Sequence, residues 1–445
     1  MLLLKNATVI NGDGKSELRH GNILVDGDRI AAVTDRLSDC DKTGWEVIDC
    51  TGKIVIPGMI THHTHGLVNG PFLASGAPAL SEERIIAQHK RHLMHGHTTA
   101  LNVDGFCTMD EAKASAHYSP LRVKQTTVHL PLSFLAADKG DGKGLSEKHR
   151  QMTVERMLED GAVAIGEVGA GQTTAGGDYV YIPAEIKERK GVDITAKQSM
   201  ILLDAVLGKW ADKNYYNKER VAKALKDYDL DGILTPEEAR DIVWKTTFRV
   251  YDYAIGAFEE AVDASIRYGV PAILHHTPST MNIVKKCALK CADRMICAHT
   301  HLAYSPEEAI EVSRFLKNQY GVLIDVAVLD AFGDRAIEPQ QETLLAMFEN
   351  DLVDLISTDY SGGRSDSMLL CINEVVKRGY TSLPKAIALA TSAPAHCVPG
   401  LAVGAGILAP NYLADMVVVD EDDITNINRV YVGGALVVKD GEYLA

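Results

Sequence analysis

The strongest chemical signal in the chain is a pair of histidines, His63 and His65, that follows a β-branched apolar run and a Pro-Gly step at 54–58. Side chains at positions i and i+2 of a strand point to the same face. Two neutral imidazoles on one face, at the end of a buried strand, form half of a metal site. Alone, the pair fits a polar surface loop about as well, so the rest of the chain decides between the two interpretations.

Four further polar residues each stand at the end of a short apolar run that has the composition of a buried strand: Glu167, His275, His299 and Asp359. Each has an ordinary explanation when it is taken singly, because carboxylates at strand ends are often solvated or cap a helix. Together with the first pair they make four imidazoles and two carboxylates, a ligand set that suits two divalent ions. We therefore predict two divalent transition-metal ions, either zinc or an iron–zinc pair.

Two of these residues have predicted roles beyond ligation. Glu167 lies between the two histidine pairs in chain order, and its two oxygens can bridge two ions. A water shared by two metal ions is acidified towards neutral pH and becomes a nucleophile. Asp359 can ligate one ion, accept the proton of this water and later protonate a leaving nitrogen.

The sequence leaves some assignments open. His275 and His276 are adjacent, so only one of them can point into a barrel, and His299 and His301 share a face if their strand continues. We prefer His275 and His299 as ligands, and we treat His276 and His301 as candidate substrate contacts. Arg364, shortly after Asp359, fits either a clamp for a substrate carboxylate or an ordinary surface arginine.

The elements that must position these residues alternate between apolar strands and amphipathic helices over residues 56–400. Starting with 54–59, eight strands can be counted, which predicts a distorted (β/α)₈ TIM barrel rather than an open parallel sheet. Seven strands follow the first, at 98–103, 125–130, 162–168, 271–275, 295–299, 322–326 and 352–358. The predicted helices lie at 81–95, 305–319 and 340–349, among other segments.

Short strands and turns occupy residues 1–55 and 401–445, and we expect both ends to build one small β-sandwich, because neither is large enough alone. Residues 171–250 are long for a barrel loop and rich in helical pattern, at 196–209, 218–226 and 236–246, which predicts a helical insertion beside the barrel mouth.

Within the insertion, residues 227–238 match an EF-hand calcium loop, with Asp at positions 1, 3 and 5, Gly at 6 and Glu at 12. The candidate calcium ligands are Asp227, Asp229, Asp231, Ile233 and Glu238. The same residues also fit an acidic turn before a helix that Thr235, Pro236 and Glu238 would begin. EF-hands normally occur in pairs and the sequence has one such loop, so calcium, in a structural role, stays one of two interpretations.

Composition restricts the partners. The chain has 445 residues and a formal net charge of −15, which disfavours binding to nucleic acid or to an anionic membrane. The eight cysteines are scattered, and the first residues resemble a strand rather than a secretion signal. We expect free thiols, a cytoplasmic protein, a homo-oligomer and a small-molecule substrate.

Several motifs together resemble the amidohydrolase superfamily of metal-dependent hydrolases. They are Pro57-Gly58-Met59-Ile60 before His63-x-His65, His95-Gly96-His97-Thr98-Thr99, the later His275, His299 and Asp359, Thr391-Ser392-Ala393-Pro394-Ala395, Gly406-Ile407-Leu408-Ala409-Pro410 and Ala414-Asp415-Met416-Val417-Val418. The resemblance covers nearly the whole chain outside 171–250. It implies a distorted (β/α)₈ barrel with a β-sandwich from both termini.

Within that superfamily, residues 165–169 are similar to the branch with a bridging glutamate, and most of all to enamidase, which opens a cyclic enamide. Hydantoinases and dihydroorotases place a carboxylated lysine here, whereas adenine deaminases also carry a glutamate in this region. The chain departs from the family pattern at Thr61, where an Asp is usual, and in its insertion.

The resemblance therefore implies a binuclear hydrolase that cleaves a C–N bond of a small cyclic amide or enamide with a metal-bound hydroxide. The alternative is a deaminase of an amino-heterocycle, and ammonia release distinguishes it from ring opening. A non-catalytic scaffold on the same fold ranks third, because such a protein should have lost ligands and the set here is complete.

Overall fold

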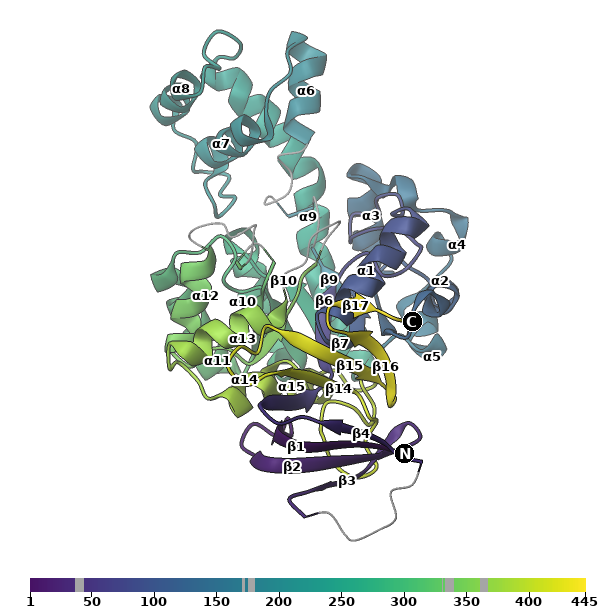
Figure 1. Ribbon diagram of the computed structural model, residues 1–445. Coiled ribbons are helices and arrows are strands. Elements are labelled where there is room, and N and C mark those ends of the chain that lie inside the picture. The colour runs from purple at the N-terminus through teal and green to yellow at the C-terminus, as the bar shows by residue number, and fades with distance from the viewer. Residues whose placement is uncertain (37–43, 170–172, 175–180, 330, 333–339, 361–366) are drawn as a thin grey trace.

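Two β-sheets organise the chain in the computed structural model (Figure 1), which describes residues 1–36, 44–169, 173–174, 181–329, 331–332, 340–360 and 367–445. One sheet has eight strands and the other has nine. The eight-stranded sheet carries the predicted site residues, and the nine-stranded sheet joins the two ends of the chain.

The eight-stranded sheet is a parallel barrel whose neighbours follow in chain order. Its strands are β6 (Met59–Thr64), β7 (His97–Asn102), β8 (Arg122–Thr127), β9 (Ala164–Val168), β10 (Ala272–His275), β11 (Met295–Ala298), β12 (Leu323–Ala327) and β13 (Leu355–Ser357). The last strand meets the first where Asp359 N donates to His63 O at 3.0 Å and Thr64 forms a bridge with Tyr360. The predicted (β/α)₈ barrel is confirmed, and the open-sheet alternative is set aside.

Helices follow the barrel strands and cover the sheet. They are α1 (Glu82–Met94), α2 (Met109–Ser115), α3 (Pro131–Lys139), α4 (Glu147–Arg150), α5 (Val154–Asp160), α10 (Met281–Cys291), α11 (Pro306–Tyr320), α12 (Gln340–Glu349), α13 (Met368–Lys377), α14 (Leu383–Leu389) and α15 (Ser392–Cys397). Helix α11 illustrates how local sequence sets their bounds. Ser305 and Glu308 form a capping box, and Gly321 ends the helix in the left-handed region with φ of 78°.

The first barrel strand begins later than the sequence predicted. The apolar run breaks at Gly58, so that β5 (Lys53–Pro57) pairs antiparallel with β14 (Met416–Asp420) in the other sheet. Only β6 enters the barrel. A Cβ atom at Gly58 would lie 2.3 Å from Thr98 Oγ1, so the close approach of β7 requires glycine where the chain passes between sheets.

The nine-stranded sheet combines both ends of the chain, as the sequence predicted. Its strands are β1 (Leu2–Ile10), β2 (Glu17–Asp26), β3 (Arg29–Thr34), β4 (Glu46–Asp49), β5, β14, β15 (Ile427–Val432), β16 (Ala435–Lys439) and β17 (Glu442–Tyr443). β5 lies between β1 and β14, so the strand just before the barrel joins the N-terminal to the C-terminal strands.

The insertion is built from α6 (Tyr181–Lys190), α7 (Ala196–Leu207), α8 (Lys218–Asp227) and the first part of α9 (Pro236–Tyr268), and it stands off the barrel on α9 (Figure 1). It has its own apolar core, which includes Ile186, Leu202, Val206, Val221 and Ile242. The sequence predicted that the insertion ends at 250, but α9 continues unbroken to Tyr268 and leads into β10. Apolar positions continue at helical spacing through Val262, and Gly269 ends the helix with φ of 69°.

Among the helices that the structure describes, none combines the length and the apolar composition needed to cross a bilayer. The seven cysteines within the described residues are free thiols.

The EF-hand-like residues join α8 to α9. Here Asp227 pairs with Lys223, Glu238 pairs with Lys190, and the Glu238 carboxylate accepts the Thr235 N–H at 2.9 Å in a capping box. Among the described residues, the groups of side chains close enough to share a metal ion lie elsewhere, so Asp229, Asp231 and Ile233 do not form such a group with these two. Calcium binding would therefore require Glu238 to exchange its present contacts for the ion.

We predict that calcium raises the melting temperature of protein stripped of other metals, because a ligand that binds only the folded state stabilises it. Calcium should not occupy the imidazole-rich barrel site, since it prefers oxygen ligands. The control is Asp227→Ala combined with Glu238→Gln, which keeps a residue able to cap α9 and should abolish the calcium effect. An unchanged melting temperature of the parent protein would leave residues 227–238 as a capped acidic turn.

Candidate metal centre

All six predicted ligands lie at the carboxyl ends of barrel strands, where the loops of this fold carry chemistry. They come from five strands: His63 from the end of β6 and His65 directly after it, Glu167 from β9, His275 from β10, His299 directly after β11, and Asp359 two residues after β13. The structure brings these six side chains into one buried cluster, in three overlapping groups whose ligand atoms lie within 4.8 Å of one another.

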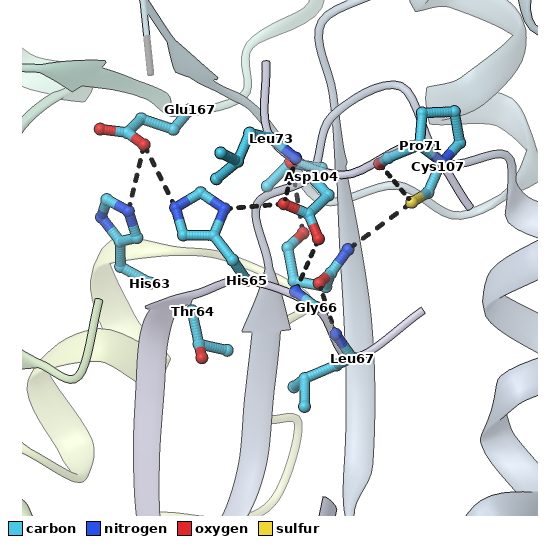
Figure 2. A network of polar contacts seen from close by, with 12 residues as sticks. His63, Thr64, His65, Gly66, Leu67, Pro71, Leu73, Asp104, Cys107 and Glu167 are labelled. Atoms are coloured by element: carbon cyan, nitrogen blue, oxygen red, sulfur yellow. Dashed lines mark hydrogen bonds and ion pairs between the residues drawn. The ribbon is translucent and has the colours of Figure 1, made fainter. Parts of the chain in front are cut away.

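Glu167 occupies the centre of the cluster. Its Oε1 lies 2.9 Å from both His275 Nδ1 and His299 Nε2. Its Oε2 lies 3.3 Å from His63 Nε2 and 3.5 Å from His65 Nε2 (Figure 2). One carboxylate oxygen thus faces each histidine pair, which is the arrangement that a bridging carboxylate needs.

The second carboxylate, Asp359, lies on the side of the first histidine pair. Its Oδ1 is 3.4 Å from His63 Nε2 and 3.5 Å from His65 Nε2. The Asp359 side chain is 18% exposed, whereas that of Glu167 is 1% exposed. Of the two, Asp359 is therefore the carboxylate that solvent or a substrate can reach.

Charge within the cluster keeps both carboxylates ionised. Burial alone would raise the pKa of Glu167, but the imidazoles of His63 and His275 hold this pKa well below its usual value. The pKa of Asp359 is also lowered, with burial opposed chiefly by His63. Burial lowers the pKa of His299, and the Glu167 carboxylate outweighs it and raises this pKa to about 9. Positive charge thus favours the ionised form of both carboxylates, and the carboxylates in turn favour a protonated His299.

The donor set fits divalent transition-metal ions. Neither ring nitrogen of His63 has a hydrogen-bond partner among the described residues, although Nε2 faces two carboxylates. A buried polar atom that lacks a partner is costly, and a metal ion on Nε2 would remove that cost. Imidazole nitrogens with carboxylate oxygens are the ligand types that zinc and iron accept.

Two buried carboxylates that the sequence analysis missed contact the backbone or rings of predicted ligands. Asp104 Oδ1 lies 2.7 Å from His65 Nδ1. Asp325, in the middle of β12, accepts hydrogen bonds from His299 N at 2.9 Å and Ser357 Oγ at 3.0 Å, and lies 3.2 Å from His62 Nε2. The signal that could have found Asp325 is an acidic residue inside an otherwise apolar strand, because aspartate is rarely buried without partners.

The structure describes two of the three candidate substrate residues, His276 and His301. His276 lies away from the cluster, with Nδ1 3.3 Å from Thr300 Oγ1 and Nε2 3.3 Å from Tyr304 Oη. His301 is buried, and neither of its ring nitrogens has a hydrogen-bond partner among the described residues. Burial, together with the charge of His299, lowers the pKa of His301 to about 4, so its ring is neutral. Arg364 lies outside the described residues.

Sequence relatives of the chain include dihydroorotases. The enzyme from Streptococcus thermophilus strain CNRZ 1066 is 24% identical over 435 residues, which are 94% of this chain and 90% of the relative. The dihydroorotase of Listeria monocytogenes serovar 1/2a strain EGD-e is 25% identical over 181 residues, 40% of this chain and 38% of its own. The chain therefore spans less than two fifths of that relative's length.

Solved structures share the fold at low identity. A β-aspartyl dipeptidase from Fervidobacterium islandicum AW-1, in complex with a β-Asp-Leu dipeptide, has a TM-score of 0.58 and 15% identity, and the match covers 100% of this chain and 97% of that one. The D-hydantoinase (dihydropyrimidinase) from Thermus sp. has a TM-score of 0.53 and 16% identity, with 100% and 96% covered.

The family model described as Amidohydrolase family matches residues 54–440, which include the whole barrel and its candidate metal centre. Because this match spans far more than half of the chain, the protein belongs to the amidohydrolase family.

Proposed function

We propose that this protein is a binuclear metal-dependent hydrolase that cleaves a C–N bond of a small cyclic amide or enamide. The observation that carries the proposal is Glu167, whose two oxygens face two separate histidine pairs. Relatives whose names denote enzymes of cyclic amides, the dihydroorotases and the D-hydantoinase, support the substrate class. The glutamate, in place of the carboxylated lysine of those families, favours the enamidase-like branch.

The six ligands would hold two divalent ions, and these ions would acidify a water and polarise the substrate carbonyl. The protein's own contribution to proton transfer falls to Asp359, the carboxylate that solvent can reach. In this proposal it would accept the proton of the attacking water and deliver it to the leaving nitrogen. Glu167 is buried and surrounded by imidazoles, so its role is to hold the centre together rather than to exchange protons with solvent.

His301 is the described residue that best fits a substrate contact. It follows β11 on the same loop as His299, and neither of its ring nitrogens has a hydrogen-bond partner within the part of the chain that the structure describes. A neutral imidazole can donate from one nitrogen and accept at the other, which suits an amide group. A bound substrate would thus satisfy a polar group whose isolation is otherwise costly.

Deamination of an amino-heterocycle is the second candidate. The feature that favours it is also Glu167, because adenine deaminases resemble this chain in carrying a glutamate in that region. The two reactions differ in their product, since deamination releases ammonia and ring opening does not. A non-catalytic role is disfavoured, because all six predicted ligands are present and converge.

The proposed function is tested by metal analysis and a substrate screen. We expect about two transition-metal ions per chain and turnover of at least one cyclic amide, cyclic enamide or imide. Chelation should abolish turnover, and returning zinc or iron should restore it. Full activity in folded protein after complete removal of metal would contradict the proposal, and ammonia release from amino-heterocycles alone would select the deaminase.

Asp359→Asn should lower kcat by orders of magnitude, because the amide cannot accept the water's proton. The fold and most of the metal should remain, since five other ligands stay in place. Circular dichroism and metal analysis check this expectation beside the kinetics. Asp351→Asn, at an exposed carboxylate with positive φ, is the matched control and should behave as the parent. Near-normal turnover in Asp359→Asn would move the proton-transfer role elsewhere.

Glu167→Gln should instead lower metal occupancy, because an amide offers one oxygen where the bridge needs two. We expect the metal-to-protein ratio after dialysis to fall from about two towards one or less, with a matching loss of rate. Glu349→Gln, at an exposed position of α12, is the control for the same substitution. Unchanged occupancy and rate would show that Glu167 is not a bridge and would remove the reason for preferring the enamidase-like branch.

A further inference from the structure

Asp104 joins a predicted ligand to the loop that follows it. This carboxylate lies two residues beyond β7 and is 1% exposed. Its Oδ1 accepts from His65 Nδ1 at 2.7 Å and from Leu73 N at 2.9 Å, and its Oδ2 accepts from Gly66 N at 2.6 Å (Figure 2). The mechanism does not use Asp104, yet it contacts both the ligand ring and the two ends of the segment 66–73.

These contacts determine which nitrogen of His65 carries a proton. An ionised carboxylate only accepts hydrogen bonds, so the hydrogen between Asp104 and His65 is on Nδ1. The lone pair of Nε2 is then free for a cation on the opposite side of the ring. On that side lie Glu167 Oε2 and Asp359 Oδ1, each 3.5 Å away. The lone pair of an unprotonated nitrogen is repelled by two carboxylates that face it. A cation between the three groups, either a proton or a metal ion, removes this repulsion.

We propose that Asp104 is a positioning residue, which fixes the tautomer and orientation of His65 so that Nε2 binds metal. It acts through His65 and does not itself reach the substrate. The inference rests on the proposed function in one respect, that His65 is a metal ligand. Histidine ligands commonly donate their second N–H to a carboxylate, and loss of such a partner costs about 10–100-fold in metal affinity or activity.

The same loop has two anchors that do not touch a ligand, and these provide controls. Asn102 Oδ1 accepts from Leu67 N at 3.1 Å, and the thiol of Cys107 donates to Pro71 O at 3.3 Å. Removing either anchor loosens the segment 66–73 but leaves the contact between Asp104 and His65. A purely structural role for Asp104 would make its variants behave like variants of these two residues.

The test measures metal affinity directly, with Zn²⁺ and Co²⁺ titrated into metal-free protein against a competing chelator. We expect Asp104→Ala to lower the affinity for one of the two ions by about 10–100-fold and to alter the absorption spectrum of the bound Co²⁺. Asp104→Asn preserves the shape of the side chain and keeps one acceptor oxygen. Its NH₂ group must face either the N–H of Gly66 or the N–H groups of Leu73 and His65, which cannot accept a hydrogen bond. We therefore expect a smaller loss of metal affinity than in Asp104→Ala. Activity of both variants should recover at high metal concentration, which would not happen in Asp359→Asn.

The controls, Asn102→Ala and Cys107→Ala, should lower the melting temperature while keeping both metal affinities within about threefold of the parent. Unchanged affinities in a folded Asp104→Asn or Asp104→Ala protein would overturn the proposal, as would equal losses in the control variants. A parent protein that binds two ions but hydrolyses no cyclic amide would overturn the proposed function and leave the role of Asp104 standing. A parent protein that binds no metal would overturn both.

Discussion

The structure depends on one electrostatic constraint, an ionised Glu167 that is buried among four imidazoles. Taking a carboxylate out of water costs several kcal/mol unless cations and hydrogen bonds compensate it. Each oxygen of Glu167 faces two ring nitrogens, and two further buried carboxylates, Asp104 and Asp325, contact the ligands from outside the cluster. So many acidic groups in so small a volume call for positive charge, and the divalent ions of the proposed function would supply it.

The barrel satisfies this constraint because it brings the ends of distant strands to one place. The predicted ligands are separated by up to 296 positions in the chain, from His63 to Asp359, yet Asp359 N donates to His63 O. His299 and Asp359 have positive φ, 38° and 44°, where non-glycine residues are uncommon. The surrounding barrel strands hold these two backbone conformations. The packing of the barrel therefore compensates the conformational free energy that they cost.

Much of this could be predicted from the sequence, because strand-end residues follow directly from periodicity. The runs before Glu167, His275 and His299 are short and apolar, and each ends at a polar residue. This pattern predicts both the position of each strand and the strand end at which the candidate site residue lies. The break at Gly58 could not be predicted, because the need for glycine there depends on how closely Thr98 of a neighbouring strand approaches. Asp104 was missed, and the direction in which His276 points could not be predicted, for a related reason: whether a side chain turns towards the predicted ligands or away from them depends on the packing around it.

The insertion, the part of the chain that departs most from the family pattern, contacts the segment that follows β11. Lys209 of the insertion pairs with Glu308, and the rings of Trp210 and Tyr304 meet edge to face at 6.0 Å. Tyr304 belongs to the connection between β11 and α11 that also carries His299 and His301, and Glu308 lies in the first turn of α11. Since barrel enzymes keep their chemistry on strand ends and vary their loops, an insertion held against this connection would, under the proposed function, bear on which substrate enters rather than on how the bond is broken.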